Sequence, residues 1–447
     1  MTTAELNTST TFDVNWAEQA AKVAKTRGES SAFAERRRAA ASVMRSLALP
    51  TRADELWRRT DFRTLEAALS TLDPFVIPEP ATNVSTLPAG VLERLGEDAL
   101  CPPIVIQVDG GTAFERSTET LERQGVIVCS LDRAARDHAD KLEGHYGALL
   151  GDDVDWYTAA GSALRSGGAF VYVPDGVEAA EPIRIAQWIS RPGVLAAPRT
   201  VIVLGRGAKA VIVDEQSSVT AEGIALHVGG VEAFVGDDAK LSYATLQDWG
   251  RNVYHYANHR ARVGRNAELQ WIQTMLGGRM AKANAYFDLA GAGAQAFVHG
   301  FMFGDQRQHF HLHTLQRHLV EQTTSDLLIK CCLKDRARSI YQGLIQVSEG
   351  AQRTDAYQAN RNLLLSDLAR ADSIPGLEIL ANDVRCTHGA TIGHVDDEQL
   401  YYLMTRGLPR LEAQRLVVEG FFAPVLDRIP LDDVREQLRR EIEHKLG

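Results

Sequence analysis

The sequence predicts a mainly β protein whose core is a parallel β-helix between two helical ends. From Phe170 onward, runs rich in β-branched residues alternate with Gly, Asp and Asn turns, as is typical of many short strands. A short turn signature also recurs in this region, and each copy leads into a strand. Its alanines lie 31, 28 and 27 residues apart, at Ala208, Ala239, Ala267 and Ala294.

A repeat of this length in a β region indicates coils that stack on one another, because small turn residues let successive coils pack closely. The alternative is a β-sandwich built from irregular hairpins. The repeats lack the Asn-Gly and Asp-Gly loops that mark tight hairpins, so we favour the β-helix.

This pattern divides the chain into three regions. Residues 1–166 form a mixed α/β region that is mostly helical, residues 167–393 form the β-helix, and residues 394–447 form a second helical region. The stretch from Ala32 to Leu47 is rich in Ala, Arg and Glu and predicts a helix. Short β-type runs and one more short helix come after it, at residues 104–108, 126–129 and 156–164.

Capping and breaking residues organise the carboxy-terminal region. Asp396 and its acidic neighbours suit a helix start, and Gly407 suits a helix end. Pro424 and Pro430 are expected to break the next helical stretch. A single apolar stripe then marks the final helix, at Leu431, Val434, Leu438, Ile442 and Leu446. The stripe either packs against its own domain or docks a partner subunit.

Bulk composition excludes several classes of protein. The chain has 45% hydrophobic and 24% charged residues, as globular proteins do. Its 58 acidic and 48 basic residues give a formal net charge of -10, which argues against a nucleic-acid partner because phosphate binding needs clustered Lys and Arg. We see neither a leader-like amino terminus nor a long apolar run, and therefore expect a cytoplasmic protein with no membrane partner.

The five cysteines are sparse and lack Cys-x-x-Cys spacing, which fits a reducing compartment and excludes a zinc ribbon. Cys331 and Cys332 are adjacent, so their side chains would point to opposite faces of a strand. We expect one or both to be buried as small apolar residues rather than to share a metal.

Three alternating histidines form the first candidate metal site. His309, His311 and His313 would lie on one face of a strand, with neighbours about 6.5 Å apart. Two imidazoles and a carboxylate hold iron in β-barrel oxygenases, so a mononuclear metalloenzyme is one interpretation. Structural stacking of the three rings is the other.

Cys386 and His388 form the second candidate site. They are two residues apart, so an extended backbone would place a thiolate and an imidazole on one face, within reach of one ion. Iron and zinc normally take four donors. The pair would therefore be half of a ligand set that a second chain completes, and packing with no metal role is the alternative. Gly389 would let another backbone approach closely.

Several nucleotide-binding and hydrolytic motifs are missing from the sequence. It has no Gly-x-x-x-x-Gly-Lys-Ser/Thr phosphate loop, no Gly-x-Gly-x-x-Gly fingerprint and no Gly-x-Ser-x-Gly elbow. We therefore expect the chain neither to bind a nucleotide nor to hydrolyse ATP by itself, so that any energy comes from a partner.

Long ordered words in the carboxy-terminal half resemble the SufB/SufD family of iron–sulfur cluster assembly scaffold proteins. They are RTDAYQANRNLLLS at residues 353–366, CTHGATIG at residues 386–393 and DEQLYYL at residues 397–403. SufB-like chains carry a Glu-His-Glu-Ala-Thr word. This sequence has instead the SufD form, Cys386-Thr387-His388-Gly389-Ala390-Thr391.

This resemblance implies a right-handed parallel β-helix in a cytoplasmic SUF complex with a SufB-like paralogue and a SufC-like ATPase. It implies that the carboxy-terminal helices dock the ATPase and that the last coils pair with SufB. The chain would be a non-catalytic scaffold in which Cys386 and His388 hold iron or a transient iron–sulfur cluster shared with SufB. The main sulfur-accepting cysteine of SufB falls on Asn360 here, so that role would belong to the partner.

Two alternatives stay open. One is a mononuclear metal-binding enzyme that uses His309, His311 and His313. The other is a purely structural SufD-like subunit whose Cys386 and His388 only pack an interface. We also expect that the isolated chain can form a homodimer, because an unpaired β-helix end exposes strand edges that are prone to association.

Overall fold

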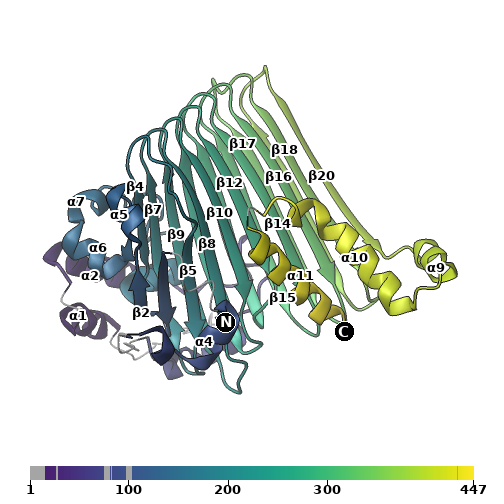
Figure 1. Ribbon diagram of the computed structural model, residues 1–447, viewed down its shortest axis with the longest axis horizontal. Helices are drawn as coiled ribbons and strands as arrows, with labels where there is room; N and C mark the ends of the chain where they lie inside the picture. Colours follow the sequence, from purple (N-terminus) through teal and green to yellow (C-terminus); the bar gives the residue numbers. More distant parts are fainter. Residues whose placement is uncertain (1–15, 27–28, 75–80, 82, 97–102, 430) are drawn as a thin grey trace, which may run out of the picture.

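A long parallel β-solenoid, with helices before and after it, dominates the computed structural model (Figure 1). The structure describes residues 16–26, 29–74, 81, 83–96, 103–429 and 431–447. Apart from one antiparallel pair at the beginning of each sheet, successive strands pair in parallel rather than as hairpins, which confirms the predicted β-helix and rules out the sandwich.

The amino-terminal region is mixed α and β, as predicted. Its short strands are β1 (Ile104–Val108), β2 (Gly111–Arg116) and β3 (Ile127–Ser130). Ser30 caps α2, the helix predicted at Ala32 to Leu47. The helices are α1 (Trp16–Thr26), α2 (Ser31–Ser46), α3 (Arg63–Ala68), η1 (Leu69–Thr71), η2 (Val84–Thr86), α4 (Ala89–Leu95), α5 (Glu119–Arg123), α6 (Leu131–Asp137), α7 (Ala139–Leu142) and α8 (Trp156–Ala163).

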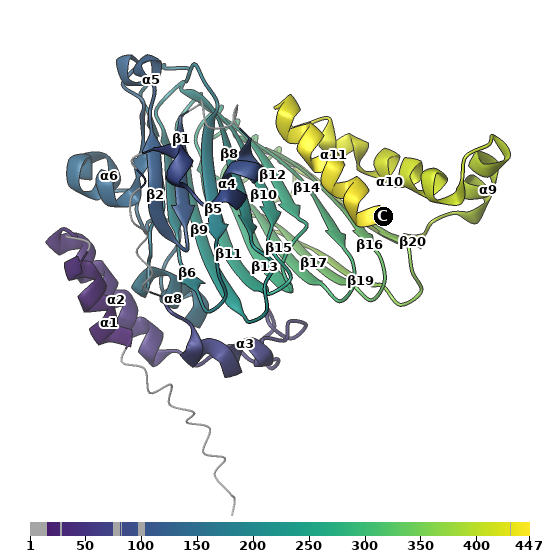
Figure 2. The same cartoon turned by 60° about the horizontal axis from the view of Figure 1, so that its bottom comes forward.

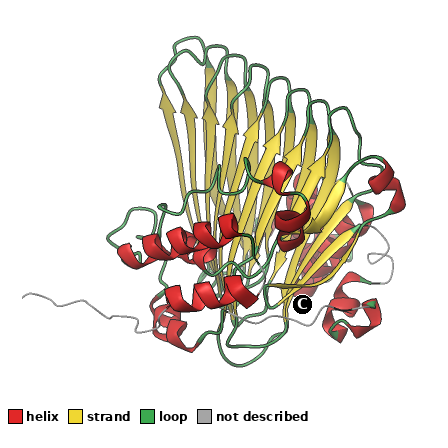
Figure 3. Cartoon of the chain, turned by 90° about the vertical axis from the view of Figure 1, so that its left-hand side faces the viewer, coloured by secondary structure: helices red, strands yellow, loops and turns green. Residues whose placement is uncertain are grey.

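Two facing sheets build the solenoid (Figure 3). The first sheet continues from β2 and β1 through β5 (Ile183–Ile189), β8 (Lys209–Ser218), β10 (Lys240–Asp248), β12 (Glu268–Met275), β14 (Gln295–Gly304), β16 (Thr324–Leu333), β18 (Asp355–Leu364) and β20 (Arg385–His394). The second continues from β3 through β4 (Ala169–Val173), β7 (Arg199–Leu204), β9 (Ala225–Val235), β11 (Val253–Val263), β13 (Met280–Leu289), β15 (His309–His318), β17 (Arg338–Val347) and β19 (Arg370–Ile379), with β6 (Leu195–Ala196) beside β9.

The recurring turn signature marks one corner of the solenoid. Each copy begins with a residue of positive φ, which Gly, Asp and Asn adopt most readily: Gly207 (67°), Asp238 (59°), Asn266 (53°) and Gly293 (76°). The alanine that comes next is fully buried in every copy. Each strand then starts in register with its neighbours, so that Lys209, Lys240, Glu268 and Gln295 stack.

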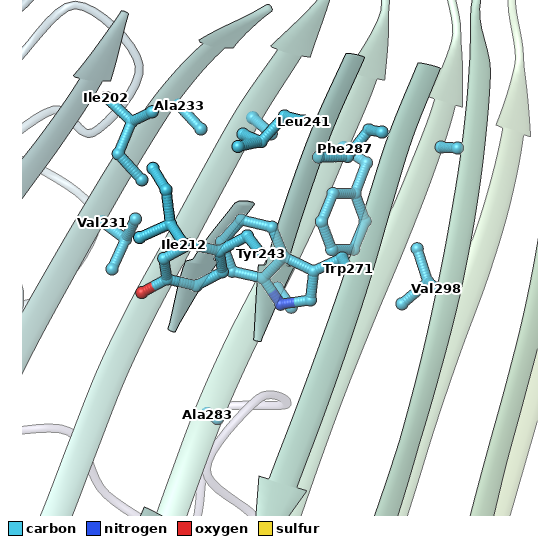
Figure 4. Close-up of a cluster of buried hydrophobic side chains, with 14 of the residues drawn as sticks. Ile202, Ile212, Val231, Ala233, Leu241, Tyr243, Trp271, Ala283, Phe287 and Val298 are labelled. Atoms are coloured by element: carbon cyan, nitrogen blue, oxygen red, sulfur yellow. The ribbon is translucent and has the colours of Figure 1, made fainter. Parts of the chain in front are cut away.

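Stacked apolar side chains fill the space between the two sheets. Tyr243 and Trp271 are register partners whose ring centroids lie 4.2 Å apart, and Phe287 from the opposite sheet meets the indole edge-on (Figure 4). Burying such large rings supplies much of the stabilisation of the core. Side chains at every second position of each strand therefore decide what the interior contains.

Three helices come after the solenoid: α9 (Asp397–Thr405), α10 (Arg410–Leu426) and α11 (Asp432–Leu446). Helices α10 and α11 lie along the outer face of the first sheet (Figure 2). The prediction that Pro424 breaks a helix is wrong, because it lies inside the last turn of α10. The missing N–H there would have met only the carbonyl of exposed Gly420, which water can reach. Pro430 lies outside the described residues.

The apolar stripe of α11 packs against its own chain. Val434, Leu438, Ile442 and Leu446 are buried in one cluster with side chains of β12, β14 and β16. The first of the two alternatives for this stripe is therefore correct. None of the helices in the described part of the chain is long and apolar enough to cross a membrane.

Buried histidines recur through the solenoid. Burial lowers the pKa of eight imidazoles, to about 3 or about 4 for six of them and well below 6.5 for His255 and His311; the six are His227, His259, His299, His309, His313 and His318. Four carboxyls have the opposite shift, because burial raises the pKa of Asp214 to about 6 and also raises the pKa of Glu66, Glu215 and Asp326. The eight histidines outnumber these carboxyls, so they dominate the response to acid.

We predict that the free energy of unfolding falls as the pH is lowered from about 7 to about 5. Below about pH 6.5 the unfolded chain takes up protons on these histidines while the folded chain does not, and each unmatched proton costs about 1.4 kcal/mol per pH unit. The four carboxyls with raised pKa offset part of this effect below about pH 6, because they take up protons in the folded chain before they do so in the unfolded chain. Urea unfolding at several pH values measures the slope.

Two substitutions control this experiment. His318→Gln removes a buried imidazole and should reduce the slope, whereas His444→Gln changes an exposed one and should leave the slope as it is. An unfolding free energy that is constant across this pH range would contradict the prediction.

Candidate functional site

The carboxy-terminal end of the solenoid is open. Strands β19 and β20 each span ten residues, and each has a neighbour on one side only. The last coil also exposes large apolar side chains, namely Leu377, Ile379, Leu380 and Ile392. Unpaired strand edges with apolar side chains favour association with another chain.

Cys386 and His388 lie on β20 at this open end. Their register partners on β18 are Ala356 and Gln358, which are both buried in the interior. The sulfur of Cys386 borders the small apolar cluster that holds Ile345, Val347, Ala351, Ala356 and Ala381. Because side chains alternate along a strand, the imidazole two residues on shares the inward face with the thiol. The thiol and the imidazole thus lie together at the mouth of the solenoid.

The two side chains differ in their surroundings. Cys386 is half-buried, and burial raises the pKa of its thiol, with the carboxylate of Asp355 adding to the effect. A metal that takes the thiolate must therefore displace this proton. His388 is exposed, and a Cβ at the next residue, Gly389, would meet nothing within 4 Å. Because consecutive residues point to opposite faces, the described chain leaves both faces of β20 uncovered here.

A polar layer lies one coil below His388. Gln358 is fully buried, yet neither its Oε1 nor its Nε2 has a hydrogen-bond partner. A Cβ at Gly343 would lie 2.6 Å from Nε2 and 2.7 Å from Oε1 of this amide, so only glycine leaves it room. The hydroxyl of Tyr341 also borders Gly343 and lies 2.9 Å from Oγ1 of Thr314. An unpaired buried amide is costly, so this one points to a missing partner.

Asn360 occupies the next inward position of β18. It is fully buried, its Nδ2 donates to the carbonyl of Ile329, and its Oδ1 accepts from Nδ2 of Asn362. The Asn360 side chain is therefore hydrogen-bonded inside the solenoid, and it lacks the sulfur atom of the SufB cysteine that falls on this position.

His309, His311 and His313 point to the outer face of β15, under the amino-terminal region. Nδ1 of His311 lies 2.6 Å from the hydroxyl of Thr60 and accepts from Nζ of Lys282 at 3.2 Å. Burial lowers the pKa of Lys282 to about 7.

The environment of these histidines suits packing. Nδ1 of His313 lies 2.7 Å from the Tyr286 hydroxyl, so His311 and His313 have different partners. Nε2 of His309 and Nε2 of His311 are buried without a hydrogen-bond partner. Across the described residues, no group of three or more His, Cys, Asp and Glu side chains is placed to hold a metal ion. The geometry therefore gives the metalloenzyme alternative no support.

Cys331 and Cys332 behave as expected from their adjacency. Both are fully buried, Cys331 in the interior cluster and Cys332 in the cluster beneath α10 and α11. Burial raises the pKa of both thiols, that of Cys331 to about 12. They are packing residues on opposite faces.

A second exposed surface lies on α9 and α10. It presents Tyr401 and Tyr402, which are 70% and 57% exposed, and also Met404, Leu411 and Leu416. We call these five residues the helical apolar patch. Sequence periodicity did not single them out, because it draws attention to the buried stripe of α11. Gln358 was also missed, since only the three-dimensional register places it beneath His388.

Comparisons with known proteins match this architecture. A family model described as "SUF system FeS cluster assembly, SufBD core domain" matches residues 187–421, and one described as "SufBD protein N-terminal region" matches residues 104–185. The iron–sulfur cluster assembly protein SufD of Bacillus subtilis is 31% identical over 82% of this chain and 85% of its own length.

Two further relatives agree. An iron–sulfur cluster assembly SufBD family protein of Mycobacterium tuberculosis is 36% identical over 54% of this chain and 61% of its own length. The SufB protein of Bacillus subtilis is 26% identical over 76% of this chain and 74% of its own length. The chain therefore belongs to the SufB/SufD family of iron–sulfur cluster assembly proteins, and it is SufD-like.

Proposed function

We propose that this chain is a non-catalytic scaffold subunit of the SUF complex, which pairs with a SufB-like paralogue and docks a SufC-like ATPase. The observation that carries the proposal is the open end of the solenoid, where an inward thiol and imidazole meet two unpaired strand edges. A paralogue with the same fold could continue both sheets across that end.

Cys386 and His388 would contribute half of the ligands for iron or a nascent iron–sulfur cluster, which is the cargo of the complex. Thiolate and imidazole are both good ligands for iron, and two more donors would come from the partner. Both groups must lose a proton to bind, and the pKa of Cys386 is already raised, so cargo binding should weaken in acid.

Gln358 would orient the imidazole of His388. Ligating histidines usually give their other ring N–H to a hydrogen-bond acceptor, which fixes the tautomer. The buried Oε1 of Gln358 has no partner and belongs to the residue directly in register with His388. An N–H from the imidazole would satisfy this oxygen and leave the second ring nitrogen for the metal.

The helical apolar patch would dock the ATPase. Exposed aromatic and aliphatic side chains of this kind are typical of protein interfaces. Because the apolar stripe of α11 is buried against the chain's own solenoid, docking of the ATPase would use the outward residues of α9 and α10. ATP binding and hydrolysis by the partner would then move the paired scaffolds and expose the shared ligands.

The cytoplasm is the compartment that we propose. The four cysteines in the described part of the chain are all free thiols, as is typical of a reducing environment. A homodimer through the same open end is what we expect of the chain when no SufB-like partner is present.

We predict that His388→Ala and Cys386→Ser leave complex assembly intact but slow cluster formation by about 10-fold or more, because each removes a donor to the cargo. The measurement is cluster formation by a reconstituted complex of this chain with SufB-like and SufC-like partners, followed by absorbance. Gln358→Leu should slow it as well, and Gln358→Glu should restore part of the rate.

Thr387→Val is the matched control. Thr387 lies between the two proposed ligands on the same strand and points to the opposite face. If both His388→Ala and Cys386→Ser formed clusters normally, the ligand role would be wrong. The purely structural alternative, in which the two residues only pack an interface, would then remain. Loss of assembly in these variants would also contradict the assigned role.

We predict that Tyr401→Ser combined with Leu416→Ser weakens capture of the ATPase by about 10-fold or more, since interface anchors carry much of the binding energy. Both residues are exposed, so the unfolding midpoint should hardly move. Val154→Ser, at a residue that is 48% exposed in the amino-terminal region, is the control. Unchanged capture of the ATPase by the double variant would show that the ATPase docks at another surface.

A further inference from the structure

Arginines line a groove at the second corner of the solenoid. Four of them come from four successive turns, at Arg251, Arg279, Arg307 and Arg336, and are 28, 28 and 29 residues apart. The groove has a volume of about 740 Å³ and is also lined by Gln306, Gln308, Asp335, Ser366 and Leu368. We call it the arginine groove.

Three of these arginines lack a counter-charge. Arg251 forms an ion pair with Asp305, but within the described residues no carboxylate lies within ion-pairing distance of Arg279, Arg307 or Arg336, which are all exposed. The one acid that lines the groove, Asp335, accepts the backbone N–H of Gln306 at 2.9 Å. The groove is therefore strongly positive in a chain whose formal net charge is -10. It would attract anions in preference to the surrounding surface.

The spacing of the turns that carry these arginines indicates which shape of anion fits the groove. The turns before β13, β15 and β17 step along the solenoid by one strand spacing, about 4.8 Å. An α-helix advances about 5.4 Å per turn, so acidic side chains at every third or fourth position keep pace with this ladder. Side chains on one face of an extended peptide repeat at about 6.6 Å, which is further from the strand spacing.

We propose that the arginine groove binds the acidic face of an α-helix of a partner protein. The match in spacing favours this occupant over an extended peptide, and the formal net charge of -10 argues against a nucleic acid. Arginine suits the role because its planar fork takes both oxygens of a carboxylate. The groove shares no residue with the helical apolar patch or with Cys386 and His388, although Ser366 and Leu368 at its far end lie in the turn before β19. The proposal therefore does not depend on the function proposed above.

A defined helical peptide tests the proposal on the full chain. The probe is a labelled, lactam-bridged helix of about 20 residues with Glu at every fourth position. Fluorescence anisotropy at low salt measures its affinity. The triple variant Arg279→Gln, Arg307→Gln, Arg336→Gln should weaken binding by about 10-fold or more, because it removes three close charge pairs.

The charge-matched control is Arg206→Gln, Arg262→Gln, Arg353→Gln, which removes three exposed arginines elsewhere. It should change the affinity by less than about 2-fold. Equal losses in the two triple variants would overturn the proposal, because they would show a general charge effect.

Three further results would also overturn it. One is equally tight binding of a proline-broken, extended peptide with the same glutamates. Another is tighter binding of inorganic tripolyphosphate or of a single-stranded oligonucleotide. The third is self-association of the chain that the groove variant abolishes, since the occupant would then be a second copy.

Discussion

In-register stacking of parallel strands is the constraint on which the rest of the structure depends. Each inward side chain lies directly above the equivalent side chain of the previous coil, about 4.8 Å away. One column of the first sheet therefore runs through Tyr243, Trp271, Val298, Leu327, Gln358 and His388. This spacing stacks the rings of Tyr243 and Trp271 in the core and places the amide of Gln358 beneath the imidazole of His388. It also sets the distance between successive turns along the arginine groove.

This column changes from apolar to polar as it approaches the open end, and the change has an energetic meaning. Trp271 and Leu327 stabilise their coils by burial, whereas the unpaired amide of Gln358 costs free energy where it lies. A solenoid that only needed stability would place an apolar side chain there. The cost is offset only if another group reaches the amide, and the register places His388 on the next strand directly above it.

Local sequence was enough to predict the coils of the solenoid, but not the contacts of the segments that pack against them. The Gly, Asp or Asn before each repeated alanine reports a positive φ that the turn requires, so the repeat could be found from Asn266 and Ala267 and their equivalents. The contact between Thr60 and His311 joins residues 251 positions apart, and no short-range pattern encodes it. For the same reason Arg279 and Arg307 look like isolated charges until the coils are stacked. The prediction at Pro424 was wrong because the last turn of a helix tolerates a proline that the middle of a helix does not.

The two ends of the solenoid are unequal, and this asymmetry bears on the site that we propose at Cys386 and His388. At the first end the antiparallel pairs of β1 with β2 and of β3 with β4 close the sheets. At the other end the chain leaves β20 and turns back along the outer face of the first sheet as α10 and α11, so it does not cross the last coil. Stacked-repeat folds need a cap at each end, because an uncapped coil exposes its strand edges and its interior. One end of the solenoid is capped and the other leaves Cys386 and His388 uncovered, and this difference is the reason why we propose that a second chain completes the open end.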